Sequence, residues 1–288
     1  MTNAAGSAGA KGGGVASALP ADVDEFWDRR ASLTPDDAVA RDVVYVAVDR
    51  IDAGHARVAW IDPATDQVVV DERAKRAILL AFRLMPMVAM QVGEFRYNDR
   101  VPLTTRLDDV RAVPGSIVRW GAYVAPGAVL MPSFVNIGAY VESGTMIDTW
   151  ATVGSCAQVG KNVHVGGGAG IGGVLEPPNA VPVVIEDDVA IMSRCMVVEG
   201  ARVRTGAVLG AGTILARTTH VIDVQTGEEL PPGEVPAWSV CVGGTRMRKF
   251  DGGEFGLPCV LVLKRLAEGS THDKAALNDI LRDHGVSS

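Results

Sequence analysis

Residues 146–165 read MIDTWATVGSCAQVGKNVHV, and in this stretch an aliphatic residue recurs at every sixth position. The spacing continues on both sides in two series. These are Val129, Val135, Val141, Ile147, Val153, Val159, Val165 and Ile171, and then Ile185, Ile191, Val197, Val203, Leu209, Leu215 and Val221. Because neither an α-helix nor an ordinary β-strand repeats every six residues, the period belongs to a larger unit.

A small or β-branched residue follows these aliphatic residues four positions later. The set is Ser133, Ala139, Thr145, Ala151, Ala157, Val163 and Ala169, and then Val189, Cys195, Ala201, Ala207, Thr213 and Thr219. Such a repeat is typical of a parallel β-helix, in which three hexapeptides close a triangular coil of about eighteen residues. We expect the aliphatic residues to fill the axis of the prism. Coils of this kind wind left-handed, so we expect that handedness by analogy.

The composition is that of a cytoplasmic protein without a nucleic-acid or membrane partner. The net charge of −7 argues against a nucleic-acid-binding surface, although it leaves room for a local basic pocket. The four cysteines lie far apart and show no metal-ligand spacing, so we expect reduced thiols. The N-terminus lacks the apolar region of a signal peptide, and no apolar run reaches membrane-spanning length.

We expect a mainly β protein in four parts. They are a disordered tail (1–20), a small N-terminal α/β domain (21–110), the left-handed β-helix (111–245) and a C-terminal strand and helix extension (246–288). In the second part, helical spacing of the residues Val23, Phe26, Trp27 and Arg30 predicts a first helix. Thr34 and Pro35 read as the start of a second helix that runs to Arg50, and Asp71 as the N-cap of another that ends before Pro86. Short strands are expected at 58–61 and 68–70.

The repeat has an irregular start and two interruptions. Ile117 and Tyr123 extend the phase backwards as a first coil. Between Ile171 and Ile185 the step is fourteen residues, so an external loop must leave the prism there. A second excursion follows Val221, and the coil resumes at 235 and 241. A strand at 259–266 and a helix capped by Asp273 are expected to end the chain.

Few residues stand out as candidates for chemistry. His164 and His220 directly precede aliphatic residues of the repeat, which makes each a possible base at a coil corner, although five histidines are also expected by chance. Only these two histidines lie in the repeat, so we predict no metal site. Asp148 has Met146, Ile147 and Trp150 around it, and an apolar setting would suit a carboxylate to general-base work. The alternative is a solvated turn aspartate.

Three longer runs carry a specific resemblance. They are LMPSFVNIGAYV (130–141), GTMIDTWATVGSCAQVGKNVH (144–164) and GIGGVLEP (170–177). Together they resemble the tetrahydrodipicolinate N-succinyltransferases, which act in bacterial lysine (diaminopimelate) biosynthesis, and the resemblance extends from about Phe26 to Arg282. It implies a homotrimer with active sites between neighbouring subunits. It also implies transfer of succinyl from succinyl-CoA to the amine of a dicarboxylate acceptor, the ring-opened 2-amino-6-oxopimelate, without a metal.

The resemblance also implies roles for particular residues. It places a substrate-binding arginine at Arg111, within DVRAVP (109–114), and a substrate-contacting aspartate at Asp148, our candidate catalytic residue. A guanidinium suits a carboxylate, and the attacking amine must lose a proton. Coenzyme A needs cationic partners for its phosphates, and three residues could supply them: Arg246, Arg248 and Lys249. A solvated basic loop is the alternative reading of those three.

One position departs from the family pattern. Met196, in CMVVEG (195–200), stands where the resemblance implies an active-site glutamate. Glu199 cannot replace it directly, because three extended residues displace it by roughly 10 Å. The departure keeps two alternatives open, a paralogous acyltransferase with another CoA thioester or amine acceptor in secondary metabolism, and a non-catalytic trimeric scaffold. The sequence also leaves succinyl and acetyl donors undistinguished.

Overall fold

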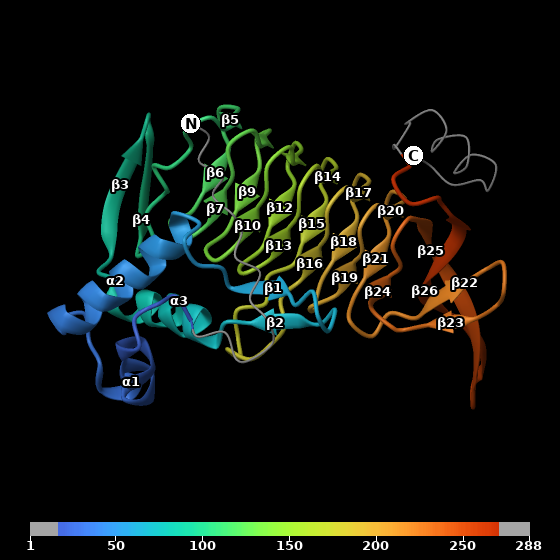
Figure 1. Ribbon diagram of the computed structural model, residues 1–288, viewed down its shortest axis with the longest axis horizontal. Coiled ribbons are helices and arrows are strands. Elements are labelled where there is room, and N and C mark those ends of the chain that lie inside the picture. The colour runs from blue at the N-terminus through green and yellow to red at the C-terminus, as the bar shows by residue number, and fades with distance from the viewer. Residues whose placement is uncertain (1–16, 271–288) are drawn as a thin grey trace.

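The computed structural model of the chain describes residues 17–270. Most of the predicted tail and the helix expected after Asp273 therefore lie outside the described residues. Figure 1 shows a long stack of short strands, with the helices at the N-terminal end and a pair of long strands at the C-terminal end. Within residues 17–270, no helix is long and apolar enough to cross a membrane.

The N-terminal domain follows the predicted order of elements. They are α1 (Asp22–Asp28), a 3₁₀ turn (Arg30–Ser32), α2 (Ala38–Asp52), β1 (Ala59–Ile61), β2 (Val68–Val70) and α3 (Glu72–Leu84). Asp71 caps α3 as predicted, because its carboxylate accepts a hydrogen bond from the Ala74 amide. The predicted start of α2 is wrong. Thr34 donates its amide to the Asp37 carboxylate (2.7 Å), which holds 34–37 as a turn, and the helix begins only at Ala38.

The observed boundary between the tail and the N-terminal domain also differs from the predicted one. Leu19 is buried in the core of the domain, next to Val23 and Phe26 of α1. Ser17 donates its hydroxyl to the Asp71 carboxylate at 2.6 Å. Residues 17–20 therefore belong to the N-terminal domain and not to a tail, because one leucine in this stretch finds an apolar site.

The stack consists of strands only two residues long. The coil strands are β5 (Arg111–Ala112), β6 (Ile117–Val118), β7 (Tyr123–Val124), β8 (Val129–Leu130), β9 (Phe134–Val135), β10 (Tyr140–Val141), β11 (Met146–Ile147), β12 (Thr152–Val153), β13 (Gln158–Val159), β14 (His164–Val165), β15 (Gly170–Ile171), β16 (Val184–Ile185), β17 (Ala190–Ile191), β18 (Met196–Val197), β19 (Arg202–Val203), β20 (Val208–Leu209), β21 (Ile214–Leu215) and β24 (Glu234–Val235). Through β18, each pairs in parallel with the third strand farther along the chain, so that Met146 lies beside His164. This confirms a mainly β fold of parallel strands, with a step of seventeen or eighteen residues except where a loop leaves the prism.

The strands form three sheets, which the chain visits in turn. The first face also includes four later strands, β22 (Val221–Asp223), β23 (Glu229–Leu230), β25 (Ser239–Phe250) and β26 (Gly253–Arg265). Its order is β23-β22-β26-β25-β20-β17-β14-β11-β8-β5, that of the second face is β21-β18-β15-β12-β9-β6, and that of the third face is β24-β19-β16-β13-β10-β7. In every coil strand after β5 the second residue points inward and is buried, while the first points outward, away from the axis. The outward columns are therefore available for surface chemistry where no other part of the chain covers them.

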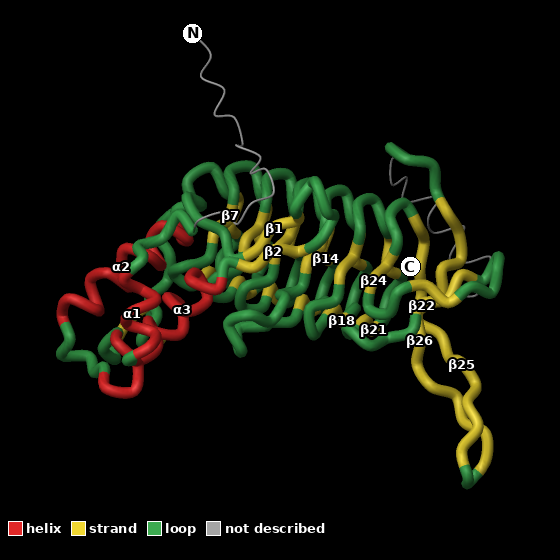
Figure 2. The backbone as a smooth tube through the Cα atoms, turned by 60° about the horizontal axis from the view of Figure 1, so that its bottom comes forward, coloured by secondary structure: helices red, strands yellow, loops and turns green. Residues whose placement is uncertain are grey.

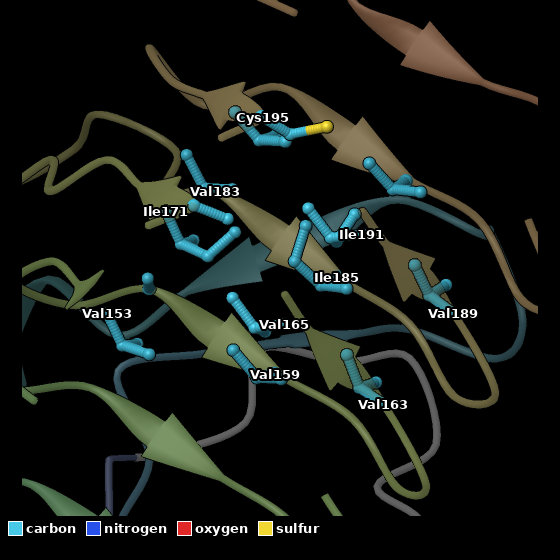
Figure 3. Close-up of a cluster of buried hydrophobic side chains, with 14 of the residues drawn as sticks. Val153, Val159, Val163, Val165, Ile171, Val183, Ile185, Val189, Ile191 and Cys195 are labelled. Carbon is cyan, nitrogen blue, oxygen red and sulfur yellow. The ribbon is translucent and has the colours of Figure 1, made fainter. Parts of the chain in front are cut away.

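The inward residues stack along the axis. Figure 3 shows Val153, Val159 and Val165 pointing toward one another, and Ile171 and Ile185 continue the stack. All five are at most 1% exposed. Burying one such side chain stabilises the fold by about 1.5–3 kcal/mol. The axial stack is therefore the main apolar core of the molecule.

The predicted phase is wrong at the first coil. The buried residues are Val118, Val124 and Leu130, and not Ile117, Tyr123 and Val129, which point outward. Leu130 pairs with Ile147, seventeen residues later, so the step from Leu130 to Val135 is five residues. One residue fewer at this corner shifts the phase of everything before it.

The third face is covered by the N-terminal domain. The guanidinium of Arg202 bonds Asp66, in the β1–β2 turn, at 2.7 Å, and Glu186, in the preceding coil, at 2.6 Å. Arg57 donates to the Gln158 side chain at 2.6 Å. These contacts fix the domain on the prism.

The external loop at 172–183 leaves the prism as predicted. It packs against α3, where the fully buried ammonium group of Lys75 donates to the carbonyl oxygens of Pro177 (3.2 Å) and Ala180 (2.7 Å). The buried charge is thus satisfied by backbone carbonyls. The loop is tied to the N-terminal domain and does not extend freely over the coils.

Three antiparallel hairpins were not predicted from the sequence. They are β3 (Val88–Val92) with β4 (Phe95–Asp99), β22 (Val221–Asp223) with β23 (Glu229–Leu230), and β25 (Ser239–Phe250) with β26 (Gly253–Arg265). The last hairpin begins within the coil, because Val240 and Cys241 pair with β20. It therefore crosses the expected boundary at residue 245, and the expected strand at 259–266 is only the inner half of β26.

The axial stack gives a direct test of the register. Val153 is fully buried, whereas Lys161 is exposed at a corner. We expect Val153→Asp to prevent folding, because it buries an unpaired carboxylate, and Lys161→Asp to change the free energy of unfolding by less than about 1 kcal/mol. Thermal melts followed by circular dichroism measure both. Equal tolerance of the two substitutions would contradict the assigned register.

Candidate active site

Asp148 lies at the corner that follows β11. Its amide donates to the carbonyl of Val165 in the next coil (2.9 Å). Its carboxylate atom Oδ1 accepts hydrogen bonds from the amide (2.6 Å) and hydroxyl (3.2 Å) of Thr149. The other oxygen faces Gly167, where a Cβ atom would lie 4.0 Å away. Because residue 167 has no side chain, nothing from that position covers the second carboxylate oxygen.

The surroundings of Asp148 are less apolar than the sequence suggested. Trp150 is turned outward and is 76% exposed, with a backbone φ of 60°. Its amide donates to the carbonyl of Pro132, which holds it at the corner of the coil. In this chain the indole is a surface feature beside Asp148 and not a lid over it.

Arg111 and Asp148 belong to the same face but are not in contact. Arg111 is exposed in β5, which pairs with β8, and β8 in turn pairs with β11. Two strand spacings correspond to about 10 Å.

The three basic residues expected to form one cluster lie in two different settings. Arg246 donates to Nδ1 of His220 (2.7 Å) and lies 3.4 Å from the Glu229 carboxylate, which also contacts the same ring nitrogen. Arg248 and Lys249 lie farther out on β25, where both are exposed. In the sheet, β25 is four strands from β11, or roughly 19 Å. Within one chain these cations are therefore remote from Asp148.

His220 and Glu229 were not predicted as a pair. They meet because β22 and β23 form a hairpin across the turn at Gly227. The apolar residues Val221 and Leu230, directly opposite one another, are the only sequence signal for this pairing. His164, the other candidate base, is half-buried on the first face beside Met146.

Met196 lies on the second face and not beside Asp148 on the first. Its side chain covers Gly170 in the preceding coil, where a Cβ atom would lie 2.6 Å from its sulfur. It is 39% exposed. Glu199 follows at the next corner and is exposed. The residue that departs from the family pattern is thus an apolar side chain on an accessible surface.

The cysteines are not candidates for nucleophilic chemistry. All four are free and buried. Burial raises the pKa of Cys156 and Cys241 to about 12 and that of Cys195 to about 11. Thiolates are therefore scarce at neutral pH. Within residues 17–270, no three His, Cys, Asp or Glu side chains come together as a metal site.

Comparison with known proteins identifies the family. The family model described as "Tetrahydrodipicolinate N-succinyltransferase N-terminal" matches residues 18–84. The 2,3,4,5-tetrahydropyridine-2,6-dicarboxylate N-succinyltransferase of Gluconobacter oxydans is 49% identical over 272 residues, which cover 91% of this chain and 97% of that protein. The enzyme of the same name from Paramagnetospirillum magneticum is 47% identical over 280 residues, 93% and 99% of the two chains. The chain belongs to the tetrahydrodipicolinate N-succinyltransferase family.

A solved structure supports the fold. A Campylobacter jejuni protein described as a 2,3,4,5-tetrahydropyridine-2-carboxylate N-succinyltransferase superposes with a TM-score of 0.50. The match covers 77% of this chain and 62% of that chain, with 19% sequence identity. At this identity the likeness concerns the fold alone.

Asp148 can be tested without disturbing the coil. We expect Asp148→Asn to reduce turnover by roughly two to four orders of magnitude while the melting temperature is retained. The amide oxygen of asparagine can still accept both hydrogen bonds from Thr149, so only the proton-accepting carboxylate is lost. Steady-state kinetics and a thermal melt measure the two effects.

The matched control is Asp187→Asn. Asp187 is also a corner aspartate, and it accepts a backbone hydrogen bond from Lys161 at 2.7 Å. We expect this variant to keep its activity. If Asp148→Asn also remained fully active, the assignment of Asp148 would be wrong, and His164 or His220 would be the base to examine.

Proposed function

We propose that this protein transfers the succinyl group of succinyl-CoA to the amine of tetrahydrodipicolinate in its open form, 2-amino-6-oxopimelate, in the biosynthesis of lysine and diaminopimelate. The observation that carries the proposal is the 49% identity to a named N-succinyltransferase over 97% of its length. Such extensive identity covers both the N-terminal domain and the coils. It thus supports a shared reaction and not only a shared fold.

In the proposed reaction the acceptor amine attacks the thioester carbon of succinyl-CoA. The new N–C bond forms as the C–S bond breaks, the carboxylate of Asp148 takes the amine proton, and the CoA thiolate is then protonated. Arg111 binds a carboxylate of the acceptor through its guanidinium. Arg248 and Lys249, with Arg246, are the proposed partners of the CoA phosphates, although Arg246 is already engaged by His220 and Glu229.

We further propose a homotrimer of left-handed coils that acts in the cytoplasm. The separation of Arg111, Asp148 and the basic residues within one chain supports a site that a neighbouring subunit completes. Four free, buried cysteines suit a reducing compartment. No metal takes part in the proposed reaction, because the carboxylate alone can accept the proton.

The acyl donor can be identified by a thiol-release assay. We expect the purified protein with the acceptor to release free thiol from succinyl-CoA at least about tenfold faster than from acetyl-CoA, because the acyl carboxylate offers an additional ionic contact. Release must depend on the acceptor. Failure to release thiol from either donor would favour the alternative of a trimeric scaffold, and a preference for acetyl-CoA would contradict the assigned donor.

Met196 supports a second candidate, a paralogue that acylates a less polar amine. Its thioether presents an apolar, accessible surface where the resemblance implies a carboxylate. For the lysine enzyme, we expect Met196→Glu to raise turnover of 2-amino-6-oxopimelate by about tenfold, because it restores a carboxylate on an accessible strand position. Steady-state kinetics on this acceptor measure the gain.

Thr152→Glu is the matched control for this variant. Thr152 is an exposed outward residue of the same face, two coils earlier, so it adds the same charge elsewhere. We expect it to give no gain. If Met196→Glu also gave no gain, the acceptor would be a different amine, as the second candidate function requires.

A further inference from the structure

The β25–β26 hairpin has an inner and an outer half with different surroundings. In the inner half, 239–242 of β25 are buried against β20, and β26 lies against β22. From Gly243 to Phe250 and back to Leu257, nearly all residues are exposed. This outer half, which we call the arm, is about 25 Å long. Figure 2 shows it extending away from the prism on the side where β18 and β21 lie.

The arm carries large apolar side chains at its end. Phe250 and Phe255 are 49% and 54% exposed, and their ring centroids lie 6.1 Å apart. Both belong to one side of the ribbon, which they share with Arg248, directly opposite Phe255. Met247, on the other side, is 60% exposed. A two-stranded ribbon without a packing partner is only marginally stable in water, so a regular arm with an aromatic end requires a surface to pack on.

The same chain offers a matching surface on the second face of the prism. Ile214 of β21 and Met196 of β18 are adjacent outward residues, 59% and 39% exposed. The third face is covered by the N-terminal domain, but these positions have no such cover. Together they form a narrow apolar strip near the level of the arm along the prism.

The charges of the two surfaces are also complementary. Arg248 and Lys249 of the arm make no ion pair with any residue in 17–270. At the corner that follows β18, Glu199 is exposed and likewise has no ion pair within that range. The arm therefore carries basic residues beside its aromatic end. The strip on a second copy of the chain carries an acidic residue beside its apolar side chains, so the two surfaces are complementary in charge.

We propose that the arm of one subunit packs on the outer surface of β18 and β21 of a second copy of this chain. Phe250 and Phe255 cover Ile214 of the neighbour and end beside its Met196, which stays accessible, and the basic side chains approach its Glu199. The inference rests on the proposed assembly of identical subunits. It adds which surfaces hold them together and places Met196 at the edge of the contact.

The test is the oligomeric state of arm variants. We expect the wild-type protein to be an oligomer by multi-angle light scattering, and Phe250→Ser/Phe255→Ser to raise the dissociation constant of the assembly at least a hundredfold. The control Val39→Ser removes an exposed apolar side chain from α2 and should leave the assembly unchanged. A thermal melt of the monomer checks that the double variant folds. A wild-type monomer, or a double variant that assembles like the wild type, would overturn the proposal.

Cross-linking tests the contact directly. Ile214→Cys/Phe255→Cys should form covalent dimers and trimers with a short bis-maleimide, while neither single variant should, because the native cysteines are buried. Absence of dimers from an assembled, fully labelled double variant would overturn the proposed pairing of surfaces. Neither measurement uses activity. Loss of thiol release with intact cross-linking would thus count against the proposed function alone.

Discussion

The stacking of one aliphatic side chain per hexapeptide along the prism axis is the interaction on which the structure depends. Each coil strand is only two residues long, so it cannot exist without the strands before and after it. Its inward residue contacts the inward residues of neighbouring coils, and its backbone bonds to the strands eighteen residues away. Stability is consequently shared along the stack, as in other repeat proteins. The outward residues contribute little to this stability, so they are free to serve in contacts and chemistry.

The period of six predicted the coils from Val135 to Val221 because the inward residue there is aliphatic at almost every turn. It failed before Val135 because the first strands contain two adjacent apolar residues, as in Val129–Leu130, and either could point inward. Only the five-residue step that follows selects Leu130. The hairpins were missed for a different reason. Their outer residues are exposed on both sides of the ribbon, so the sequence shows no alternation of apolar and polar residues that would predict a strand.

The candidate site was predictable only in part. Asp148 was proposed first from its apolar sequence neighbours and then from the resemblance, whereas Arg111 was proposed from the resemblance alone. The structure adds that they lie on one face, two strands apart. The separation of Arg246 from Arg248 and Lys249 could not be predicted, because it depends on His220 and Glu229 meeting across a hairpin. Contacts between segments that are distant in sequence leave no local pattern to read.

The independence of inward and outward residues bears on how the function of such a chain can change. Met196 replaces a carboxylate implied by the family, yet Val197, the next residue, remains fully buried in the axial stack. The substitution therefore alters the accessible surface while the core that positions it stays the same. On a globular fold a change of this kind in a packed site often requires compensating changes. On this prism one outward position can change polarity alone, so the strong likeness of the whole chain to N-succinyltransferases and a locally different surface at Met196 are compatible.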